Sequence, residues 1–400
     1  MPLVGSKSES NRALMICHYA GFEPKIGNLS KADDTGLLSE LLKFINNNKG
    51  QYSLKEVDCR NAGTVFRFLA TALSLRPGKW LLTGSGRMRE RPVRHLVDAL
   101  RQLDADIEYQ SDEGFPPLII KGKELKGGCV SVDVSQSSQY ASSLLLAAPT
   151  FENGLKLHLD GGLTSLPYID MTVGIMTEYG AKVCRDGRDI VVEHSDYQNV
   201  EYVVESDWSA ASYWFEIVAL SDGGQAFLRN LKEKSVQGDK IVAGVFDRFG
   251  VRTIFEDEGA TVVKSTSNCK NLFEFDFTDA PDLFPAVVAT CAGLQVGATF
   301  TGLRNLAIKE SDRVDAMVTE LNKIGVEFEK ISDDILKMNA LRNVPFFSEV
   351  NPVVFDSHDD HRIAMALAPL SMKIGAVEIE NAEAVSKSYP DFWDDFSKLF

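Results

Sequence analysis

The stretch MVTELNKIGVEFEK, residues 317 to 330, has a layout that occurs four times along the chain. In each copy an amphipathic helical run is followed by a turn residue and then by a short strand of alternating apolar residues. The other three copies are LVDALRQLDADIEY (96–109), TVGIMTEYGAKVCR (172–185) and IVAGVFDRFGVRTIF (241–255). The turn residues Asp104, Gly180, Gly250 and Gly325 are 76, 70 and 75 residues apart. This near-constant spacing predicts an α/β fold built from a repeated βα unit.

A chain of 400 residues is too long for one ordinary hydrophobic core, so its length indicates two domains. The best boundary is EYVVESDWSAASYW, residues 201 to 214. A strand-like run ends there, and Asp207 can cap a new helix. Because this stretch is not rich in proline or glycine, we expect the hinge between the domains to be short.

The composition limits the partners of the chain. The formal net charge is −15, which argues against nucleic-acid binding because that needs a basic surface. No apolar run is long enough to span a bilayer, and the N-terminus shows no signal-peptide core. Six scattered cysteines without a C-x-x-C pair argue against zinc and disulfides and favour a reducing, cytoplasmic location. Any positive charge that matters is therefore expected to be local and directed at a small molecule.

Short Gly/Ser/Asn turns that open helices and carry a cation recur in the first half. In GSKSESNR (5–12), Ser8 can cap a helix, with Lys7 and Arg12 beside it. This layout suits an anion, although a capped surface helix fits equally well, and the Walker A glycine spacing is missing. In CRNAGTVFRFLATAL (59–73), Gly63 would let a ligand approach the backbone, and Arg67 lies one turn further on.

Two more stretches of the first half can bind anions. RMRERPVRHLVDAL (87–100) places four arginines before a helix, and we expect some to face an anion and at least two to be solvated. SQSSQYASSLLLAAP (135–149) is a hydroxyl-rich helix start, which is either a phosphate site or redundant capping. TSLPYID (164–170) adds Ser165 and Tyr168 before another helix.

The second half repeats the pattern with carboxylates. Asp282 precedes an apolar helix in DAPDLFPAVVATCAGL (279–294), where an N-cap is more common than a base. NLAIKESDRV (305–314) places Glu310 between two cations, as an exposed charged turn also would. In SHDDHRIAMALAPL (357–370), His358 and His361 bracket two aspartates, but one cluster offers too few ligands for a closed metal site. An Asp359 or Asp360 helix cap is the simpler interpretation. VSKSYPDFW (385–393) adds a lysine at 387.

Together these stretches place cations at helix starts in both halves of an acidic protein. The first half supplies Lys7, Arg12, Arg67 and Arg91, and the second supplies Lys309, Arg313, Arg362 and Lys387. Two domains that face each other with these helix ends would enclose a polyanion in the cleft between them.

The ordered motifs resemble one known family. GSKSxSNRAL, NAGTxxRFLA, RMRERPVRHLVDAL, SSQYASSLLLAAP, PYIDMT, IKESDR, DDHRIAMALA and SKSYPDF follow one another from residue 3 to about residue 393. This set resembles the EPSP synthase (3-phosphoshikimate 1-carboxyvinyltransferase) family. The resemblance implies transfer of the enolpyruvyl group of phosphoenolpyruvate to the 5-hydroxyl of shikimate 3-phosphate, with release of phosphate, in the biosynthesis of aromatic amino acids. It also implies that no metal or organic cofactor is needed and that the protein is a cytoplasmic monomer.

The resemblance further implies an inside-out α/β barrel. Each of two domains would consist of three βαβαββ-type repeats, with helices inside and sheets outside. The N-terminal domain would span residues 6–205 and bind shikimate 3-phosphate. The C-terminal domain would span residues 206–400 together with 1–5, and would supply the acid–base pair and much of the phosphoenolpyruvate site. The active site would lie in the cleft between the domains.

Residue roles follow from the resemblance as well. Asp282 is expected to take the proton of the hydroxyl and Glu310 to serve C3 of phosphoenolpyruvate, with Lys7 supporting either transfer. The remaining substrate-binding residues fall into three groups. They are Ser8 and Arg12 for the shikimate carboxylate; Ser137, Ser138, Gln139, Ser165 and Tyr168 for its phosphate; and Lys7, Gly63, Arg91, Lys309, Arg313, Arg362 and Lys387 around phosphoenolpyruvate. Asn61, Thr64 and His361 are expected to bind substrate as well.

Some positions depart from the usual family pattern. Lys7 lies close to the first residue, whereas members usually carry a further strand before it, so either the start is misassigned or the second domain lacks that strand. Val4 replaces a usual proline, and Leu166 and Ala307 stand where a basic residue is common. Three alternatives remain: a UDP-N-acetylglucosamine enolpyruvyltransferase, disfavoured because GSGRMRERP has no cysteine, a remoter RNA 3′-phosphate cyclase-like fold, and a non-catalytic anion-binding paralogue.

Overall fold

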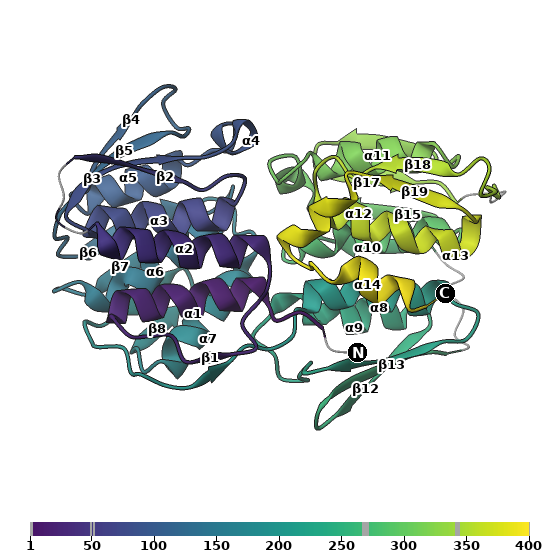
Figure 1. Ribbon diagram of the computed structural model, residues 1–400, viewed down its shortest axis with the longest axis horizontal. Coiled ribbons are helices and arrows are strands. Elements are labelled where there is room, and N and C mark those ends of the chain that lie inside the picture. The colour runs from purple at the N-terminus through teal and green to yellow at the C-terminus, as the bar shows by residue number, and fades with distance from the viewer. Residues whose placement is uncertain (1–2, 49, 51–52, 266–271, 341–344, 400) are drawn as a thin grey trace. The chain divides into compact units, whose positions relative to one another are not determined.

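The computed structural model describes residues 3–48, 50, 53–265, 272–340 and 345–399 (Figure 1). Contacts within the chain divide it into two compact units. The unit that we call N-terminal comprises residues 7–29 and 34–204, and the unit that we call C-terminal comprises 1–6, 30–33 and 205–400. The segment 30–33 belongs to the C-terminal unit although the N-terminal unit surrounds it in sequence, which no sequence signal indicated.

The helices and strands of the N-terminal unit alternate along the chain. They are α1 (Lys7–Ala20), β1 (Ile26–Gly27), α2 (Asp33–Asn47), β2 (Leu54–Asp58), α3 (Gly63–Leu75), β3 (Gly78–Thr83), α4 (Gly86–Arg89), α5 (Arg94–Gln102), β4 (Asp106–Tyr109), β5 (Leu118–Gly122), β6 (Gly128–Asp133), α6 (Gln139–Ala147), β7 (Leu155–Asp160), α7 (Leu166–Glu178), β8 (Val183–Asp186), β9 (Asp189–Val192) and β10 (Tyr202–Val203).

The C-terminal unit follows the same alternation. Its elements are α8 (Trp208–Leu220), β11 (Gln225–Arg229), α9 (Val242–Asp247), β12 (Val251–Glu256), β13 (Gly259–Lys264), β14 (Phe273–Asp276), α10 (Phe284–Gly293), β15 (Ala298–Thr301), α11 (Arg313–Asn322), β16 (Phe328–Ser332), β17 (Ile335–Met338), β18 (Val353–Asp356), α12 (His361–Leu367), α13 (Ser371–Ile374), β19 (Val377–Glu380) and α14 (Phe392–Ser397).

Within the part of the chain that the structure describes, the strands form six separate sheets, and one pattern recurs among them. The sheets β2-β3-β5-β4, β6-β7-β9-β8 and β14-β15-β17-β16 each join a parallel pair to an antiparallel third and fourth strand. The sheet β11-β13-β12 keeps the antiparallel part, and β18-β19 keeps the parallel pair. A parallel pair needs a crossover helix, so each complete sheet corresponds to a β-α-β-α-β-β repeat. The predicted α/β repeat fold is confirmed, although the sheets of the described residues do not join into a closed barrel.

The four turn residues of the sequence repeat end helices as predicted. Asp104, Gly180, Gly250 and Gly325 have φ angles of 70°, 85°, 77° and 88°, all in the left-handed region. Glycine adopts that region without a steric penalty, and aspartate is among the few other residues that tolerate it. In each case the chain then enters the strand expected from its alternating residues.

Helices fill the inside of each unit and sheets cover it. Every residue of α8, α10 and α12 is buried. By contrast, β12 alternates between buried or half-buried and exposed residues, as a strand with one solvated face does. Asp207 caps α8 by accepting a hydrogen bond from the Ala210 N–H, as the sequence indicated.

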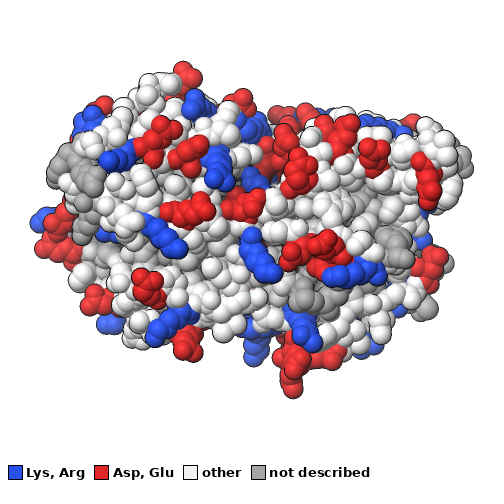
Figure 2. All heavy atoms as spheres, viewed as in Figure 1, with Lys and Arg blue, Asp and Glu red and all other residues white. Residues whose placement is uncertain are grey.

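Within the described residues, no helix combines the length and the apolar character that crossing a bilayer requires. On the face drawn in Figure 2, acidic and basic side chains are interspersed.

Candidate active site

Four helix starts lie side by side in the N-terminal unit. Arg12, in the second turn of α1, donates to Ser142 of α6 and to Thr172 and the Tyr168 carbonyl of α7. Arg67, in the second turn of α3, donates to the side chain of Gln139 at the start of α6, with Nη1 and Oε1 2.8 Å apart. These contacts bring together the N-terminal turns of α1, α3, α6 and α7, where unpaired N–H groups favour anions.

Lys7 is the first residue of α1 and is half-buried. Its Nζ lies 3.1 Å from Oδ2 of Asp34 in α2, and the side chain of Asp34 is 8% exposed. The helix begins at Lys7, so the predicted N-cap Ser8 is wrong: Ser8 lies in the first turn. The reason is that the Ser6 N–H is hydrogen-bonded to the Glu205 carbonyl, which holds the chain extended up to that point.

Arg12 is buried and is largely committed to protein acceptors. Its Nε lies 2.7 Å from Thr172 Oγ1, and Nη1 donates to the Ser8 carbonyl at 2.9 Å. With the two Nη2 contacts, four of its five N–H groups meet the protein. Burial lowers the pKa of Arg12 to about 10, and Tyr168 and Glu9 oppose this. Arg12 therefore holds three helices together, and little of its guanidinium remains for a ligand.

Gly63, at the start of α3, packs against two guanidinium groups. A Cβ built on Gly63 would lie 2.6 Å from Nη1 of Arg91 and 2.8 Å from Nη1 of Arg67. The Gln139 amide donates to Thr64 Oγ1 at 2.8 Å, which fixes the first turn of α3 against α6. Gly63 therefore makes room first for these arginines, and a ligand that binds them would also lie near its backbone.

The predicted phosphate-binding hydroxyls lie at the starts of α6 and α7. Ser137 accepts the Gln139 N–H at 3.2 Å, and Ser138 is the buried residue just before α6. Ser165 precedes α7 with a φ of 54°, in the left-handed region. Asn61 lies in the turn before α3.

The four arginines of residues 87–94 divide as predicted. Arg91 is 5% exposed, whereas Arg89 and Arg94 are exposed. Arg87 and Arg94 form ion pairs with Glu90 and Glu113 at the surface. One arginine of the four thus lies at the candidate site.

In the C-terminal unit, Arg313 is the centre of an ion-pair network. Its side chain is 1% exposed, and it contacts Asp282 at 2.8 Å, Glu310 at 2.9 Å and Asp360 at 2.9 Å. The three carboxylates raise its pKa further above the usual range, although burial alone would lower it. The alternative of an exposed charged turn is therefore wrong for Arg313, because Asp282 and Asp360, from two segments far away in sequence, contact it.

Asp282 lies between two arginines. Its second oxygen is 2.6 Å from Nη2 of Arg362, so each oxygen contacts one guanidinium. Burial would raise the pKa of Asp282, but Arg362, Arg313 and Lys309 outweigh burial and hold it well below the usual range. In this arrangement Asp282 is fully ionised and is a weak base.

The other predicted residues of this unit gather around the same network. Lys387 Nζ is 3.7 Å from Glu310 Oε1, so Glu310 also lies between two cations. Asp360 caps α12 by accepting the Arg362 N–H at 3.0 Å while it holds Arg313. His361 is buried, with Nδ1 3.6 Å from Asp360 Oδ1.

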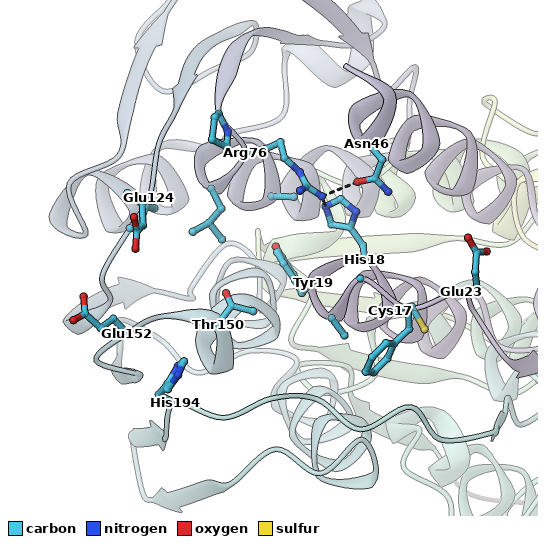
Figure 3. A pocket seen from close by; sticks show the side chains of 17 residues that line it. Cys17, His18, Tyr19, Glu23, Asn46, Arg76, Glu124, Thr150, Glu152 and His194 are labelled. Atoms are coloured by element: carbon cyan, nitrogen blue, oxygen red, sulfur yellow. Dashed lines mark hydrogen bonds between the residues drawn. The ribbon is translucent and has the colours of Figure 1, made fainter. Parts of the chain in front are cut away.

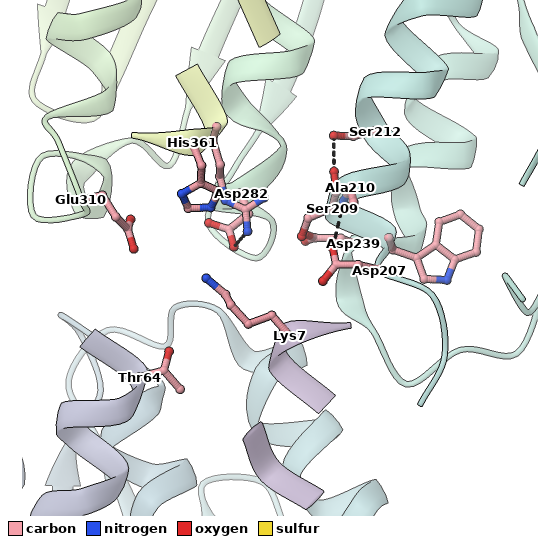
Figure 4. A network of polar contacts seen from close by, with 12 residues as sticks. Lys7, Thr64, Asp207, Ser209, Ala210, Ser212, Asp239, Asp282, Glu310 and His361 are labelled. Atoms are coloured by element: carbon pink, nitrogen blue, oxygen red, sulfur yellow. Dashed lines mark hydrogen bonds and ion pairs between the residues drawn. The ribbon is translucent and has the colours of Figure 1, made fainter. Parts of the chain in front are cut away.

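Asp239 adds a further buried carboxyl group. It lies in the short 3₁₀ turn Gly238–Ile241 and is hydrogen-bonded to the Ser209 hydroxyl (Figure 4). Burial and the charge of Asp282 raise the pKa of Asp239 to about 7, against the hydrogen bond from Ser209. A carboxyl group with this pKa can gain or lose a proton at neutral pH.

The two histidines of the 357–370 stretch face different groups. His358 Nε2 is 2.9 Å from Glu320 Oε1, whereas His361 lies against Asp360. Among the described residues, no three His, Cys, Asp or Glu side chains are placed to hold a metal ion.

A cavity of about 760 Å³ lies elsewhere in the N-terminal unit (Figure 3). It is at the C-terminal ends of α1 and α3, where Arg76 donates to Asn46 at 2.6 Å. None of the predicted site residues lines it. Its size therefore does not identify it as the site of the reaction.

Sequence reasoning missed several partners of the site residues. Asp34, Asp239, Ser142 and Thr172 carry no local signal, since their contacts join segments far apart in sequence. Asp360 was interpreted only as a helix cap, and its second contact to Arg313 could not be read from its neighbours.

Comparisons with known proteins agree with the geometry. The family model described as EPSP synthase (3-phosphoshikimate 1-carboxyvinyltransferase) matches residues 2–396. A Bacteroides fragilis 3-phosphoshikimate 1-carboxyvinyltransferase is 41% identical, over 99% of this chain and 94% of that protein. One from Colwellia psychrerythraea is 35% identical, over 99% and 96%.

Solved structures support the fold. EPSP synthase from Acinetobacter baumannii superposes with a TM-score of 0.74 at 22% identity, covering all of this chain and 94% of that one. The enolpyruvyl transferase NikO from Streptomyces tendae gives a TM-score of 0.71 at 15% identity, again over the whole chain and 94% of the other.

Proposed function

Since this chain belongs to the EPSP synthase family, we propose that it transfers the enolpyruvyl group of phosphoenolpyruvate to the 5-hydroxyl of shikimate 3-phosphate. Phosphate is the second product. The observation that carries the proposal is the network in which Asp282 and Glu310 each lie between two cations. The reaction needs two such carboxylates, because one substrate atom loses a proton while another gains one.

The charges on the two substrates match the two sets of residues. Each substrate carries a phosphate and a carboxylate. In the N-terminal unit, four helix starts and the side chains of Ser137, Ser138 and Ser165 suit shikimate 3-phosphate. In the C-terminal unit, the cations that pair with Asp282 and Glu310 suit phosphoenolpyruvate. Both units would act on the same pair of substrates, with Lys7 and Arg91 adding to the phosphoenolpyruvate side.

The proton transfers follow from the bonds that change. The 5-hydroxyl oxygen attacks C2 of phosphoenolpyruvate and gives its proton to Asp282. C3 takes a proton from Glu310, with Lys7 in support, and a tetrahedral adduct forms. The Glu310 carboxylate then takes a proton back from the C3 methyl group, the C2–O bond to phosphate breaks, and the double bond is restored. General acid–base help of this kind typically contributes ~10²–10⁴-fold.

The low pKa of Asp282 sets a condition on this mechanism. While Arg313 and Arg362 hold it, Asp282 cannot accept a proton readily. We propose that the anionic groups of phosphoenolpyruvate take over these arginines, which weakens their hold on the carboxylate and raises its pKa. The same exchange would release Glu310 from Arg313 and Lys387.

We further propose that the protein acts in the cytoplasm as a monomer, and that its product enters aromatic amino acid biosynthesis. The acidic composition supports the absence of a nucleic-acid partner. Family membership supports the biosynthetic role.

The test is a phosphate-release assay with phosphoenolpyruvate and one acceptor at a time. Release should require shikimate 3-phosphate and should equal the enolpyruvyl product formed. Release with UDP-N-acetylglucosamine instead would favour the related transferase. Binding of both substrates without turnover would favour a non-catalytic protein.

A further inference from the structure

The turn between β18 and α12 presents three consecutive site residues, Asp360, His361 and Arg362. Its backbone is held in an uncommon form, because His358 and Asp359 both have a φ of 54°. Residues with a Cβ seldom adopt this left-handed region, and two in succession need support from their surroundings. The turn therefore depends on contacts outside itself.

Glu320 of α11 supplies that support from the neighbouring repeat. It is 1% exposed, and its Oε2 accepts the Asp356 N–H at 2.9 Å, at the end of β18. Its Oε1 lies 2.9 Å from Nε2 of His358. A carboxylate only accepts, so the histidine proton is on Nε2. One buried side chain thus holds both the beginning of the turn and the first left-handed residue.

Further hydrogen bonds connect Glu320 and the turn to Asp360. Lys323, just after α11, donates to Glu320 Oε2 at 2.6 Å and to the Val354 carbonyl of β18 at 3.0 Å. The His358 N–H donates to Asp356 Oδ1 at 2.8 Å, and the Asp360 N–H donates to the Ser357 carbonyl at 2.9 Å. These hydrogen bonds therefore form a continuous path of contacts from Glu320 to Asp360. Asp360 in turn forms an ion pair with Arg313 of the site.

We propose that Glu320, with His358, is a positioning residue that sets where Asp360 and Arg362 meet the phosphoenolpyruvate side of the site. The inference rests on the proposed function for its kinetic consequence, although its structural part does not. Glu320 touches neither substrate in this account. Its loss would let the turn relax and move the Arg362 guanidinium, which contacts Asp282 at 2.6 Å.

Steady-state kinetics of Glu320→Ala provide the first test. We expect the KM for phosphoenolpyruvate to rise about tenfold, because small displacements of positioning groups cost this much or more. The KM for shikimate 3-phosphate should change by less than about twofold, since its proposed ligands lie in the other unit. Unchanged KM values, or an equal rise in both, would overturn the proposal and leave Glu320 a purely structural residue.

Matched variants show whether the hydrogen bonds or the negative charge of Glu320 matter for the KM. Glu320→Gln should restore the KM to within about threefold of the original, because the amide oxygen can accept the Asp356 N–H and the amide nitrogen can donate to the other tautomer of His358. A tenfold effect in this variant too would contradict the proposal. His158→Ala serves as the control. It removes a similar histidine–carboxylate pair at the surface, in which His158 Nδ1 lies 2.7 Å from Asp189 Oδ1, and it should change neither KM.

Amide hydrogen exchange tests the inference without relying on turnover. In Glu320→Ala, residues 356–360 should exchange at least roughly tenfold faster, while the amides of β14 and β15 stay unchanged. If Glu320→Ala does not fold, His358→Ala should show the same changes at smaller size. Equal exchange in variant and parent protein would overturn the proposal, whereas a parent protein without activity would overturn only the proposed function.

Discussion

The two units hold the cations of the candidate site in different ways. In the N-terminal unit, Arg12 meets hydroxyl and carbonyl oxygens, and Arg67 meets the neutral amide of Gln139. In the C-terminal unit, Arg313 meets three carboxylates and Arg362 meets one. Lys7 pairs with Asp34, but the two N-terminal arginines meet neutral groups, whereas the C-terminal arginines meet carboxylates that offset their charge.

This difference gives the units different tasks. A cation whose partners are neutral attracts an anion without first losing an ion pair, so we propose that Arg67, which donates to the neutral Gln139 amide, can face an anion as it stands. A cation paired with carboxylates must exchange partners, and each exchange leaves a carboxylate with a higher pKa. We therefore propose that the C-terminal unit couples anion binding to the preparation of Asp282 and Glu310 for proton transfer.

The largest expected effect is that of Asp282→Ala on turnover. Removing the carboxylate that we propose takes the hydroxyl proton should lower kcat by ~10²–10⁴-fold. Binding of shikimate 3-phosphate, measured by calorimetry, should remain, because its proposed ligands are in the N-terminal unit. Asp222→Ala removes an exposed carboxylate paired with Lys373 in the same unit and serves as the control. Near-normal turnover of Asp282→Ala would remove its assigned role.

The pH dependence of folding stability tests the buried carboxyl group Asp239, which belongs to the C-terminal unit. The pKa of Asp239 is raised to about 7 in the folded protein, whereas an unfolded aspartate titrates near ~3.9. Between these values the folded state binds more protons, so stability falls as pH rises from about 4 to about 7. Below the unfolded value both states are protonated and the penalty is absent.

Asp239→Asn should remove this penalty. The stability of the variant relative to the parent protein should therefore increase as pH rises from about 4 to about 7, by up to ~1.4 kcal/mol per pH unit. The difference between the two melting temperatures should widen accordingly. Thermal unfolding in a pH series measures this. A constant difference across the series would show that Asp239 is ionised throughout.

Particular elements show how much of the fold could be predicted from the sequence. The helix-turn-strand repeat, with its left-handed residues at 104, 180, 250 and 325, depends on local conformational preferences and was predictable. The Asp207 cap was predictable for the same reason. The pairing of Lys7 with Asp34 joins two helices, and nothing near either residue indicates it.

The candidate site shows the same limit. Motif order pointed to Asp282 and Arg313, but local evidence favoured a cap and an exposed turn. Packing of separate segments decides that Arg313 is buried among three carboxylates. Such networks depend on tertiary contacts, which a single sequence does not reveal.

A smaller effect is expected from Gly63→Ala in the N-terminal unit. The added methyl would displace the Arg91 guanidinium, which lies 2.6 Å from the Cβ position. The KM for phosphoenolpyruvate should rise roughly three- to tenfold, and glyphosate, as a competitor for the same place, should inhibit less. Gly86→Ala is the control, since nothing lies within 4 Å of its added Cβ. Unchanged kinetics and inhibition would place the ligand elsewhere.

The smallest effect is expected from metal removal. The described residues contain no group of side chains placed to bind a metal, and the proposed steps use only carboxylates and cations. Activity before and after treatment with EDTA should agree within error. A loss that zinc or magnesium restores would require a new account of His358 and His361.

The exchange of ion-pair partners is tested most directly by carbon-13 NMR of the Asp282 carboxyl group, assigned with Asp282→Asn. In the free protein its signal should show an ionised carboxylate down to the lowest pH at which the protein stays folded. With shikimate 3-phosphate and glyphosate bound as a non-reacting pair, the titration should move to higher pH. An unchanged titration in the complex would mean that Arg313 and Arg362 never release the carboxylate, and would contradict the account.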